Sequence, residues 1–186
     1  MVKISTDREK PIRNEHLILK GIRQSFGLQH ASIIETEDDL VDVVRSNGVK
    51  VNGMVMKKGI TLQKIIDQKK REKGYHEWAG VVLRKVFEVL VELEARGYYH
   101  CDINTDNIIF LPENQPDFNQ PVIIDFGNAR GPDSRETKES LSQKNSGYFA
   151  TLIVDMINPK NWHKYTGSTF KDLGDFILEN NLFSIS

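Results

Sequence analysis

Apolar residues recur at helical spacing over one long stretch of the chain, from residue 75 to residue 96. Tryptophan, valine and leucine occupy positions three, four or seven apart there, and Gly97 follows the last of them. Residues at this spacing share one face of a helix, so the pattern predicts an amphipathic helix that packs against a core. A glycine just beyond it is typical of a helix C-terminus. We expect this helix to be the scaffold of the domain.

Four shorter stretches are also predicted to be helical. The first carries apolar residues roughly on one side and a glutamate, Glu15, near its start. The second runs into a charged segment, residues 69–73, which we interpret as a solvent-exposed helix face because charge runs commonly have that role. The four stretches span residues 12–25, 60–66, 148–157 and 171–179.

Short β-strands are predicted in two regions of the chain, one before residue 57 and one between residues 108 and 124. Residues 40–45 and 49–56 are rich in valine and flank a Ser-Asn-Gly turn signal, which predicts a β-hairpin. Residues 108–110 and 122–124 are apolar runs typical of buried strands. The polar segment between them contains three prolines and suits an exposed connection. Residues 2–4 are predicted to end a further short strand.

Composition and charge narrow the class of protein. The 186 residues are 39% hydrophobic and 27% charged, as in an ordinary globular protein, and a chain of this length predicts one domain or two closely packed lobes. The net charge of −1 provides no field that would attract nucleic acid or anionic lipid. The sequence has no run of about 20 apolar residues that would span a membrane, and its first ten residues are too polar for a signal peptide. A single cysteine, Cys101, excludes an intrachain disulfide and fits a reducing compartment. We therefore expect a cytoplasmic location.

Chemically capable side chains gather in residues 100–110, which read HCDINTDNIIF. Asp102 and Asn107 lie five positions apart, and 18 residues after Asn107 comes Asp125, which follows an apolar run and precedes Phe-Gly. Carboxylate and amide oxygens suit Mg²⁺, and a carboxylate beside a hydroxyl group can accept its proton. Each motif alone is equally typical of turn residues. Their order and the predicted elements around them favour the chemical interpretation.

Together, H-x-D-x-x-x-x-N and the following D-F-G resemble the catalytic loop and the metal-binding loop of protein kinases. The resemblance implies a single domain, residues 1–186, with an α+β, protein kinase-like two-lobe fold. A reduced N-lobe would comprise residues 1–56, with a few-stranded antiparallel sheet and the C-helix. Residues 57–59 would form the hinge, and residues 60–186 an abbreviated helical C-lobe. By the same resemblance, Asp102 is the catalytic base, Asn107 and Asp125 hold Mg²⁺, and the cofactors are ATP and Mg²⁺.

The resemblance also assigns residues to nucleotide binding. Lys3 is the candidate for the strand lysine that holds the phosphates, with Glu15 as its partner on the C-helix. Met56 would lie at the back of the adenine pocket. Lys57 and Lys58 belong to the predicted hinge, whose backbone groups hydrogen-bond adenine whatever their side chains are.

Several features depart from the usual kinase pattern. No glycine-rich loop precedes Lys3, no Ala-Pro-Glu follows the polar segment 128–143, and Asn104 occupies the place where Ser/Thr kinases carry a lysine. The loop Asp-Ile-Asn-Thr-Asp-Asn is similar to the Asp-Leu-Asn-Thr-x-Asn loop of minimal kinases that pathogenic bacteria deliver into host cells. The expected cytoplasmic location is then either the cytoplasm of the producing cell or that of a host cell into which the protein is delivered.

Three functions follow from these observations. The first is an ATP- and Mg²⁺-dependent protein serine/threonine kinase, with a protein as substrate. The alternative is a pseudokinase, a kinase mimic without turnover that binds a partner protein. The third is phosphorylation of a small molecule, since antibiotic and sugar kinases share H-x-D-x-x-x-x-N. A thiol nucleophile formed by Cys101 and His100 is disfavoured, because adjacent loop residues rarely point together and a small buried thiol is the commoner outcome.

Overall fold

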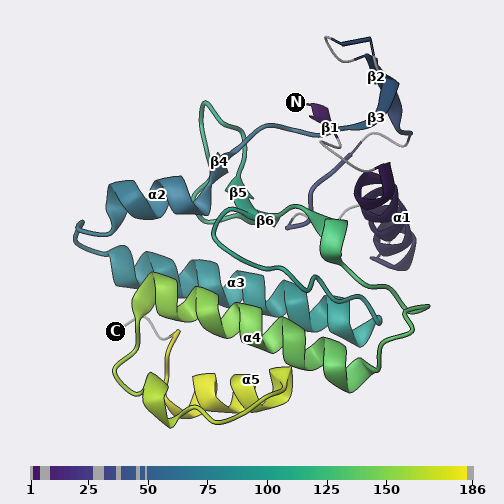
Figure 1. The fold of residues 1–186 in the computed structure, drawn as a ribbon. Coiled ribbons are helices and arrows are strands. Elements are labelled where there is room, and N and C mark those ends of the chain that lie inside the picture. The colour runs from purple at the N-terminus through teal and green to yellow at the C-terminus, as the bar shows by residue number, and fades with distance from the viewer. Residues whose placement is uncertain are drawn as a thin grey trace.

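The computed structural model describes residues 2–4, 9–26, 32–36, 39–44, 47–48 and 50–183, with the backbone alone for residues 2–4 and 9–11. In this part of the chain, five α-helices and two three-stranded antiparallel sheets form an α+β fold (Figure 1). None of the described helices combines the length and apolar character needed to cross a membrane. The α+β class predicted from the sequence is confirmed.

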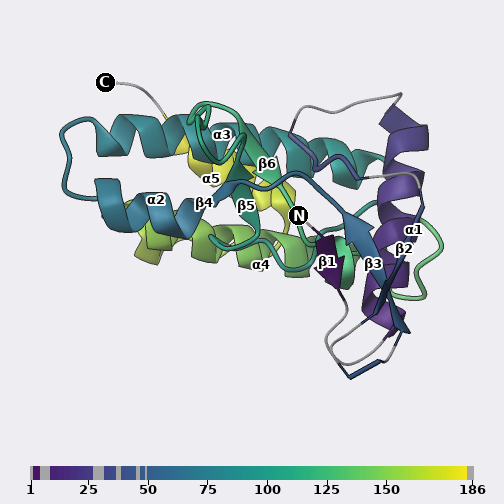
Figure 2. The same ribbon diagram turned by 90° about the horizontal axis from the view of Figure 1, so that it is seen from above.

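The first sheet lies at the N-terminal end of the molecule. It comprises β1 (Val2–Ile4), β2 (Val41–Val44) and β3 (Lys50–Val55) in the order β1-β3-β2. The predicted hairpin is confirmed, because Val43 pairs with Val51 in an antiparallel register. Helix α1 (Glu9–Phe26) packs against β3 and buries Leu19 (Figure 2). Burying such a side chain contributes about 1.5–3 kcal/mol.

The second sheet lies near the middle of the molecule. It comprises β4 (Ile60–Thr61), β5 (Ile108–Phe110) and β6 (Pro121–Ile123) in the order β4-β5-β6. The outer side of β6 also receives the segment after α1: Ile33 forms a parallel bridge with Ile123, and the Ile34 amide donates to the Ile123 carbonyl at 3.1 Å. Residues 56–59 connect β3 of the first sheet to β4 of the second.

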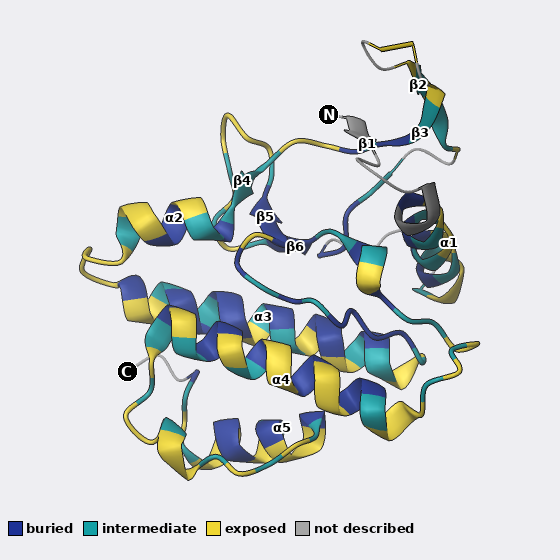
Figure 3. Ribbon diagram, in the orientation of Figure 1, coloured by how far each residue is buried: buried dark blue, intermediate teal, exposed yellow. Residues whose placement is uncertain are grey.

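Of the four remaining helices, the first lies beside the second sheet and the other three are stacked below it (Figure 1). They are α2 (Leu62–Lys69), α3 (Tyr75–Ala95), α4 (Lys138–Ile157) and α5 (Phe170–Glu179). Helix α3 contacts α4, and α4 contacts α5. Buried residues run along α3 and along the side of α5 that faces α4 (Figure 3). The scaffold role predicted for residues 75–96 agrees with this central position.

Two expectations about helix ends are wrong. Helix α4 begins at Lys138, ten residues before the expected start at 148, because the Thr137 side chain caps it by accepting from the Ser140 amide at 3.2 Å. Small and polar residues fill its buried face there, which hid the apolar period. The charged run 69–73 lies at the surface as expected, but only its first residue is helical: α2 ends at Lys69, and a turn of exposed residues leads to Gly74, with φ of 85°.

Candidate active site

The two motif segments meet because of how β5 and β6 pair. Ile108 at the start of β5 lies opposite Ile123 at the end of β6. The residue before β5 is therefore the neighbour of the residue after β6, and the Ile124 amide donates to the Asn107 carbonyl at 2.9 Å. Asp125 is the next residue along the chain. The strand register thus brings the loop 100–107 and Asp125 to one end of the second sheet.

Asparagine amides shape the loop around Asp102. Asn107 Nδ2 donates to the Asp102 carbonyl at 2.8 Å, and Asn104 Nδ2 donates to the same carbonyl at 3.1 Å. Asn104 Oδ1 in turn accepts from the backbone amides of Asp106 and Asn107, at 2.9 and 3.1 Å. A side-chain oxygen that accepts two residues onward forms an Asx turn, a local structure that asparagine favours. Asn104 therefore closes the loop.

Three amides surround the carboxylate of Asp102 itself. Asn128 Nδ2 donates to Oδ2 at 3.1 Å, whereas Asn104 reaches Oδ1 at 3.4 Å and Asn107 reaches Oδ2 at 3.5 Å. Hydrogen bonds of this kind are most favourable near about 2.9–3.0 Å, so Asn128 makes the best of the three. In the described part of the chain, Asp102 has no ion pair with a lysine or arginine. Its half-buried carboxylate is held by neutral donors.

Asp125 occupies an unusual backbone conformation. Its φ of 62° and ψ of 65° lie in the left-handed region, and its Oδ1 accepts from the Gly127 amide at 3.4 Å at the start of the short 3₁₀ helix η1 (Phe126–Asn128). A residue other than glycine held there costs of order 1–3 kcal/mol and persists only where its surroundings determine it. Such positions cluster at functional sites.

The surroundings of Asp125 supply that constraint. The Phe126 amide donates to Glu15 Oε1 at 3.1 Å, across a sequence separation of 111 residues. The Phe126 ring is buried and meets the His100 ring edge-on, with centroids 4.8 Å apart. His100 Nε2 also bonds the Ile124 carbonyl at 2.9 Å. His100 therefore supports the turn through both its ring and its Nε2 atom.

Helix α4 supports the loop from the other side. Cys101 has a left-handed φ of 59°, and its amide donates to Oδ1 of the fully buried Asn145 at 3.0 Å. Burial raises the pKa of the Cys101 thiol to about 11. A thiol with that pKa stays protonated at neutral pH and is a poor nucleophile, which agrees with the interpretation of Cys101 as a structural residue.

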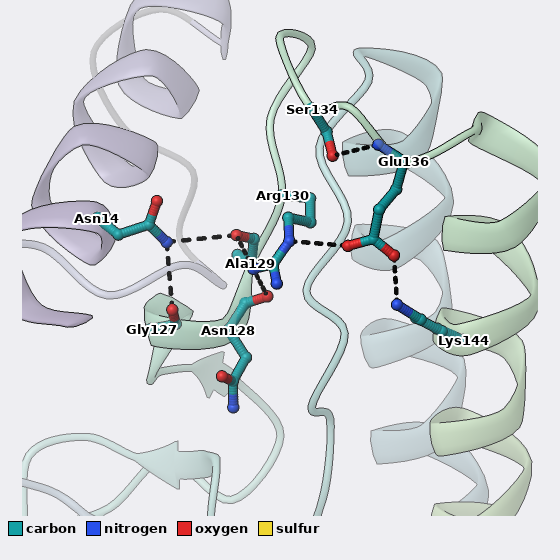
Figure 4. A network of polar contacts seen from close by, with 8 residues as sticks. All are labelled: Asn14, Gly127, Asn128, Ala129, Arg130, Ser134, Glu136 and Lys144. Carbon is teal, nitrogen blue, oxygen red and sulfur yellow. Dashed lines mark hydrogen bonds and ion pairs between the residues drawn. The ribbon is translucent and has the colours of Figure 1, made fainter. Parts of the chain in front are cut away.

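Polar contacts also hold the segment that follows the turn (Figure 4). Asn14 of α1 donates to the carbonyls of Gly127 and Ala129, at 3.2 and 3.4 Å. Arg130 pairs with Glu136 at 3.1 Å, and Glu136 also pairs with Lys144 of α4. These contacts attach the segment to helices from both ends of the chain.

Glu15 is among the residues brought to the site, and Lys3 is described only through its backbone. Glu15 is buried, with 1% of its surface exposed, and faces the turn through its bond to Phe126. Lys3 lies in β1 and pairs with Met54 in the sheet register. Its side chain lies outside the described residues, so its pairing with Glu15 stays a prediction.

The predicted hinge residues lie on the connection between the two sheets. Met56 is buried, with 4% of its surface exposed. Lys57 and Lys58 are exposed and pair with Glu35 and Glu113 respectively, each at 2.8 Å. The lysine side chains are thus engaged on the surface, and any contact with a nucleotide here would come from the backbone.

Asn107 and Asp125 carry oxygen atoms of the kind that a magnesium ion prefers. Asn107 donates its Nδ2 to the Asp102 carbonyl, and its Oδ1 accepts no hydrogen bond from the described part of the chain. Asp125 adds a carboxylate. Mg²⁺ is usually held by one or two carboxylates together with water and substrate phosphates. Within the described ranges, no three His, Cys, Asp or Glu side chains form a metal-binding group. The candidate ligands at this site are therefore the oxygen atoms of Asn107 and Asp125.

Two residues of the site were missed from the sequence. Asn128 directly follows the Asp-Phe-Gly turn, and that adjacency was a usable signal. Asn145 lies in a polar stretch of a helix, and no spacing rule connects it to Cys101. Only the packing of α4 beneath the loop reveals it.

A cavity of about 410 Å³ lies elsewhere, between α3 and α5. Its walls are mainly apolar and include Phe87, Ile177 and Phe183, with Glu88 as the only carboxylate among its lining residues. It contains none of the groups described above. The chemistry of the described residues is therefore concentrated at the Asp102 loop.

No protein-family model matches the chain, and no curated protein matches it in sequence.

Proposed function

We propose that this protein is an ATP- and Mg²⁺-dependent phosphotransferase of the protein kinase-like type, acting on serine or threonine hydroxyls of a protein substrate. In this proposal, α1 and the first sheet form a reduced N-lobe, residues 57–59 are the hinge, and the helices form an abbreviated C-lobe. One observation carries the proposal: the β5–β6 register and the Asn107–Ile124 bond gather Asp102, Asn107 and Asp125 at one place.

Phosphoryl transfer asks a protein mainly to position the reactants and to neutralise developing negative charge. Asp102 would orient the acceptor hydroxyl and take its proton as the oxygen attacks the γ-phosphorus. The bond from that phosphorus to the bridging oxygen of ATP breaks, and ADP leaves. The half-buried, amide-held carboxylate of Asp102 suits this role because it is fixed in direction and free of a cationic partner in the described part of the chain.

Asn107 and Asp125 would hold the magnesium ion, which when bound neutralises charge on the phosphates. Asp125 is held in the left-handed conformation, and its carboxylate accepts from the Gly127 amide. Glu15 couples α1 to this turn through the Phe126 amide. A shift of α1 would therefore move the residue next to Asp125, which connects the proposed N-lobe to the metal ligands.

The test is transfer of radiolabelled γ-phosphate from ATP to protein acceptors in the presence of Mg²⁺. We expect the Asp102→Ala variant to lose about 10²- to 10⁴-fold in rate, the range typical of a general base. Asp155→Ala is the matched control, because Asp155 is an exposed carboxylate on α4 and its loss should leave the rate unchanged. Equal rates for wild type and Asp102→Ala would reject the proposal.

Nucleotide binding separates this proposal from its alternatives. We expect ATP with Mg²⁺ to raise the melting temperature, since a ligand that binds only the folded state stabilises it. The Asp125→Ala variant should lose that shift. A shift without any transfer would favour a kinase mimic that binds a partner protein, and transfer to small hydroxyl compounds alone would change the substrate class.

A further inference from the structure

We propose that Asn128 is a positioning residue for the base: its amide holds the Asp102 carboxylate so that one oxygen faces the incoming hydroxyl. This inference rests on the proposed phosphotransferase function. It assigns a role to Asn128, which directly follows Asp-Phe-Gly and belongs to neither of the two motifs.

The three asparagine amides around Asp102 contact different parts of it, and this difference supports the role of Asn128. Asn104 and Asn107 approach the Asp102 carbonyl more closely than its carboxylate, with 3.1 against 3.4 Å for Asn104 and 2.8 against 3.5 Å for Asn107. Their main effect is on the backbone of the loop. Asn128 bonds only the carboxylate, at 3.1 Å to Oδ2. The side-chain direction of Asp102 therefore depends mostly on Asn128.

The backbone of Asn128 is fixed on both sides, so its side chain is presented in a set direction (Figure 4). Asn14 holds the carbonyls of the residues before and after it. The Arg130 guanidinium holds the carbonyl of Asn128 itself: its Nη1 donates to the Asn128 carbonyl at 2.7 Å and also to the Ala129 carbonyl at 3.2 Å. In Figure 4 the Asn128 side chain points away from this network. A pre-positioned donor spends little entropy in making its hydrogen bond.

The chemical type of the donor also fits. A neutral amide orients a carboxylate without cancelling its charge, whereas a cation in the same place would form an ion pair and oppose proton uptake. Asn128 is exposed, so the bond lies on the open side of the site. In the described part of the chain, the Asp102 oxygen that Asn128 does not hold, Oδ1, receives a single contact, from Asn104 at 3.4 Å, and it is the oxygen that we assign to the substrate hydroxyl.

The test compares Asn128→Ala and Asn128→Asp with wild type in the transfer assay. A hydrogen bond to a charged group is worth roughly one to two powers of ten in a rate that depends on it. We expect kcat to fall about 10-fold in Asn128→Ala, with the KM for ATP unchanged. Asn128→Asp keeps the shape but sets a second carboxylate against Asp102, so we expect a loss of about 100-fold. Asn119→Ala, at an exposed loop position, is the matched control.

A double-variant cycle shows whether Asn128 acts through the base. If it does, adding Asn128→Ala to Asp102→Ala costs nothing further in the residual rate. The same 10-fold loss in both backgrounds would overturn the inference, and so would a raised KM for the acceptor with kcat unchanged. Wild-type kcat in both Asn128 variants, with Asp102→Ala inactive, would reject the role of Asn128 and leave the proposed function standing. No Asp102-dependent transfer in wild type would reject both.

Discussion

Two segments meet at the Asp102 carboxylate, and they are held by opposite kinds of interaction. The loop 100–107 is fixed by neutral hydrogen bonds, to the buried Asn145 beneath Cys101 and to the half-buried Gln63 beside Thr105, where the hydroxyl donates at 2.7 Å. The segment 128–137 has neutral contacts at its start, and it depends in addition on ion pairs that centre on Glu136 and are partly exposed to solvent.

The difference matters because salt and pH act on the two classes unequally. Exposed ion pairs are screened by dissolved salt, while buried hydrogen bonds are hardly affected. The Asp102 backbone is therefore held by the fold itself, whereas Asn128, on the other side of the carboxylate, depends partly on the neutral amide of Asn14 and partly on charged groups that the solvent can weaken. The first two predictions below test the buried side, the third tests the exposed side, and the last tests Glu94, a half-buried carboxylate near Asn145.

The largest expected effect concerns the reactivity of Cys101. Only the thiolate reacts with alkylating reagents, and the raised pKa of about 11 leaves about 100-fold less thiolate at pH 8 than an ordinary cysteine has. We expect iodoacetamide to modify the folded protein at least that much more slowly than the protein in urea. Mass spectrometry after timed quenching measures both rates. Similar rates in the two conditions would show that the loop is not held as described.

Removing the buried acceptor under the loop should be the next largest effect. Asn145→Leu keeps the size of the side chain but leaves the Cys101 amide without its partner. An unsatisfied buried group costs about 1–3 kcal/mol, so we expect the free energy of unfolding in urea to fall by about 2 kcal/mol. Asn114→Ala, in the exposed connection between β5 and β6, is the control. Equal midpoints for Asn145→Leu and wild type would contradict the structure.

Breaking the exposed network should have a smaller effect that depends on conditions. Hydrogen bonds from Lys144 and Arg130 lower the pKa of Glu136, so the folded state favours the charged carboxylate. That contribution is complete above the ordinary pKa of a glutamate and is lost as the pH falls through the lowered value. We expect Glu136→Gln to lower the melting temperature at pH 7 and to approach wild type at acid pH.

Salt gives an independent check on the same network. The difference in melting temperature between wild type and Glu136→Gln should become smaller at high sodium chloride concentration. Trypsin should cleave after Arg135 faster in the variant than in wild type. Glu88→Gln, which alters an exposed carboxylate on α3, should show neither behaviour. A salt-independent difference would mean that Glu136 acts by packing.

The smallest expected effect concerns Glu94, near the end of α3. Burial raises its pKa, so the folded state favours the neutral acid and stability decreases as the pH rises through the raised value. Glu94→Gln removes the charge. We expect it to melt about 1 °C higher than wild type at pH 7.5, a small value because the group is only half-buried. The two proteins should coincide below the ordinary pKa of glutamate.

Local patterns predicted the parts of the site that depend on neighbours in the chain. The apolar runs around 108–110 and 122–124 indicated the two strands, and antiparallel pairing then required Asn107 and Asp125 to meet. The helix of residues 75–96 was equally clear because its apolar period is unbroken. These features follow from local spacing, which a sequence displays directly.

Long-range polar contacts were not predictable in the same way. The bond from Asn145 to Cys101 spans 44 residues and depends on how α4 packs. The start of α4 was missed because its buried residues there are a single leucine, Leu141, and otherwise serine and asparagine, which give no apolar period. Arg130, Glu136 and Lys144 read as ordinary surface charges until the fold places them together. The sequence alone contains no measure of such distances.

The attachment of the N-terminal third of the chain has a consequence for synthesis on the ribosome. Asn14 and Glu15 of α1 bond residues 126–129, and Ile33 and Ile34 join β6 at Ile123. Their partners are translated roughly 90–110 positions later. Helix α1 can pack on β3 soon after residues 50–55 have emerged, but its contacts with the turn must wait for residues 123–129. The N-terminal third of the chain therefore reaches its full set of contacts only late in translation.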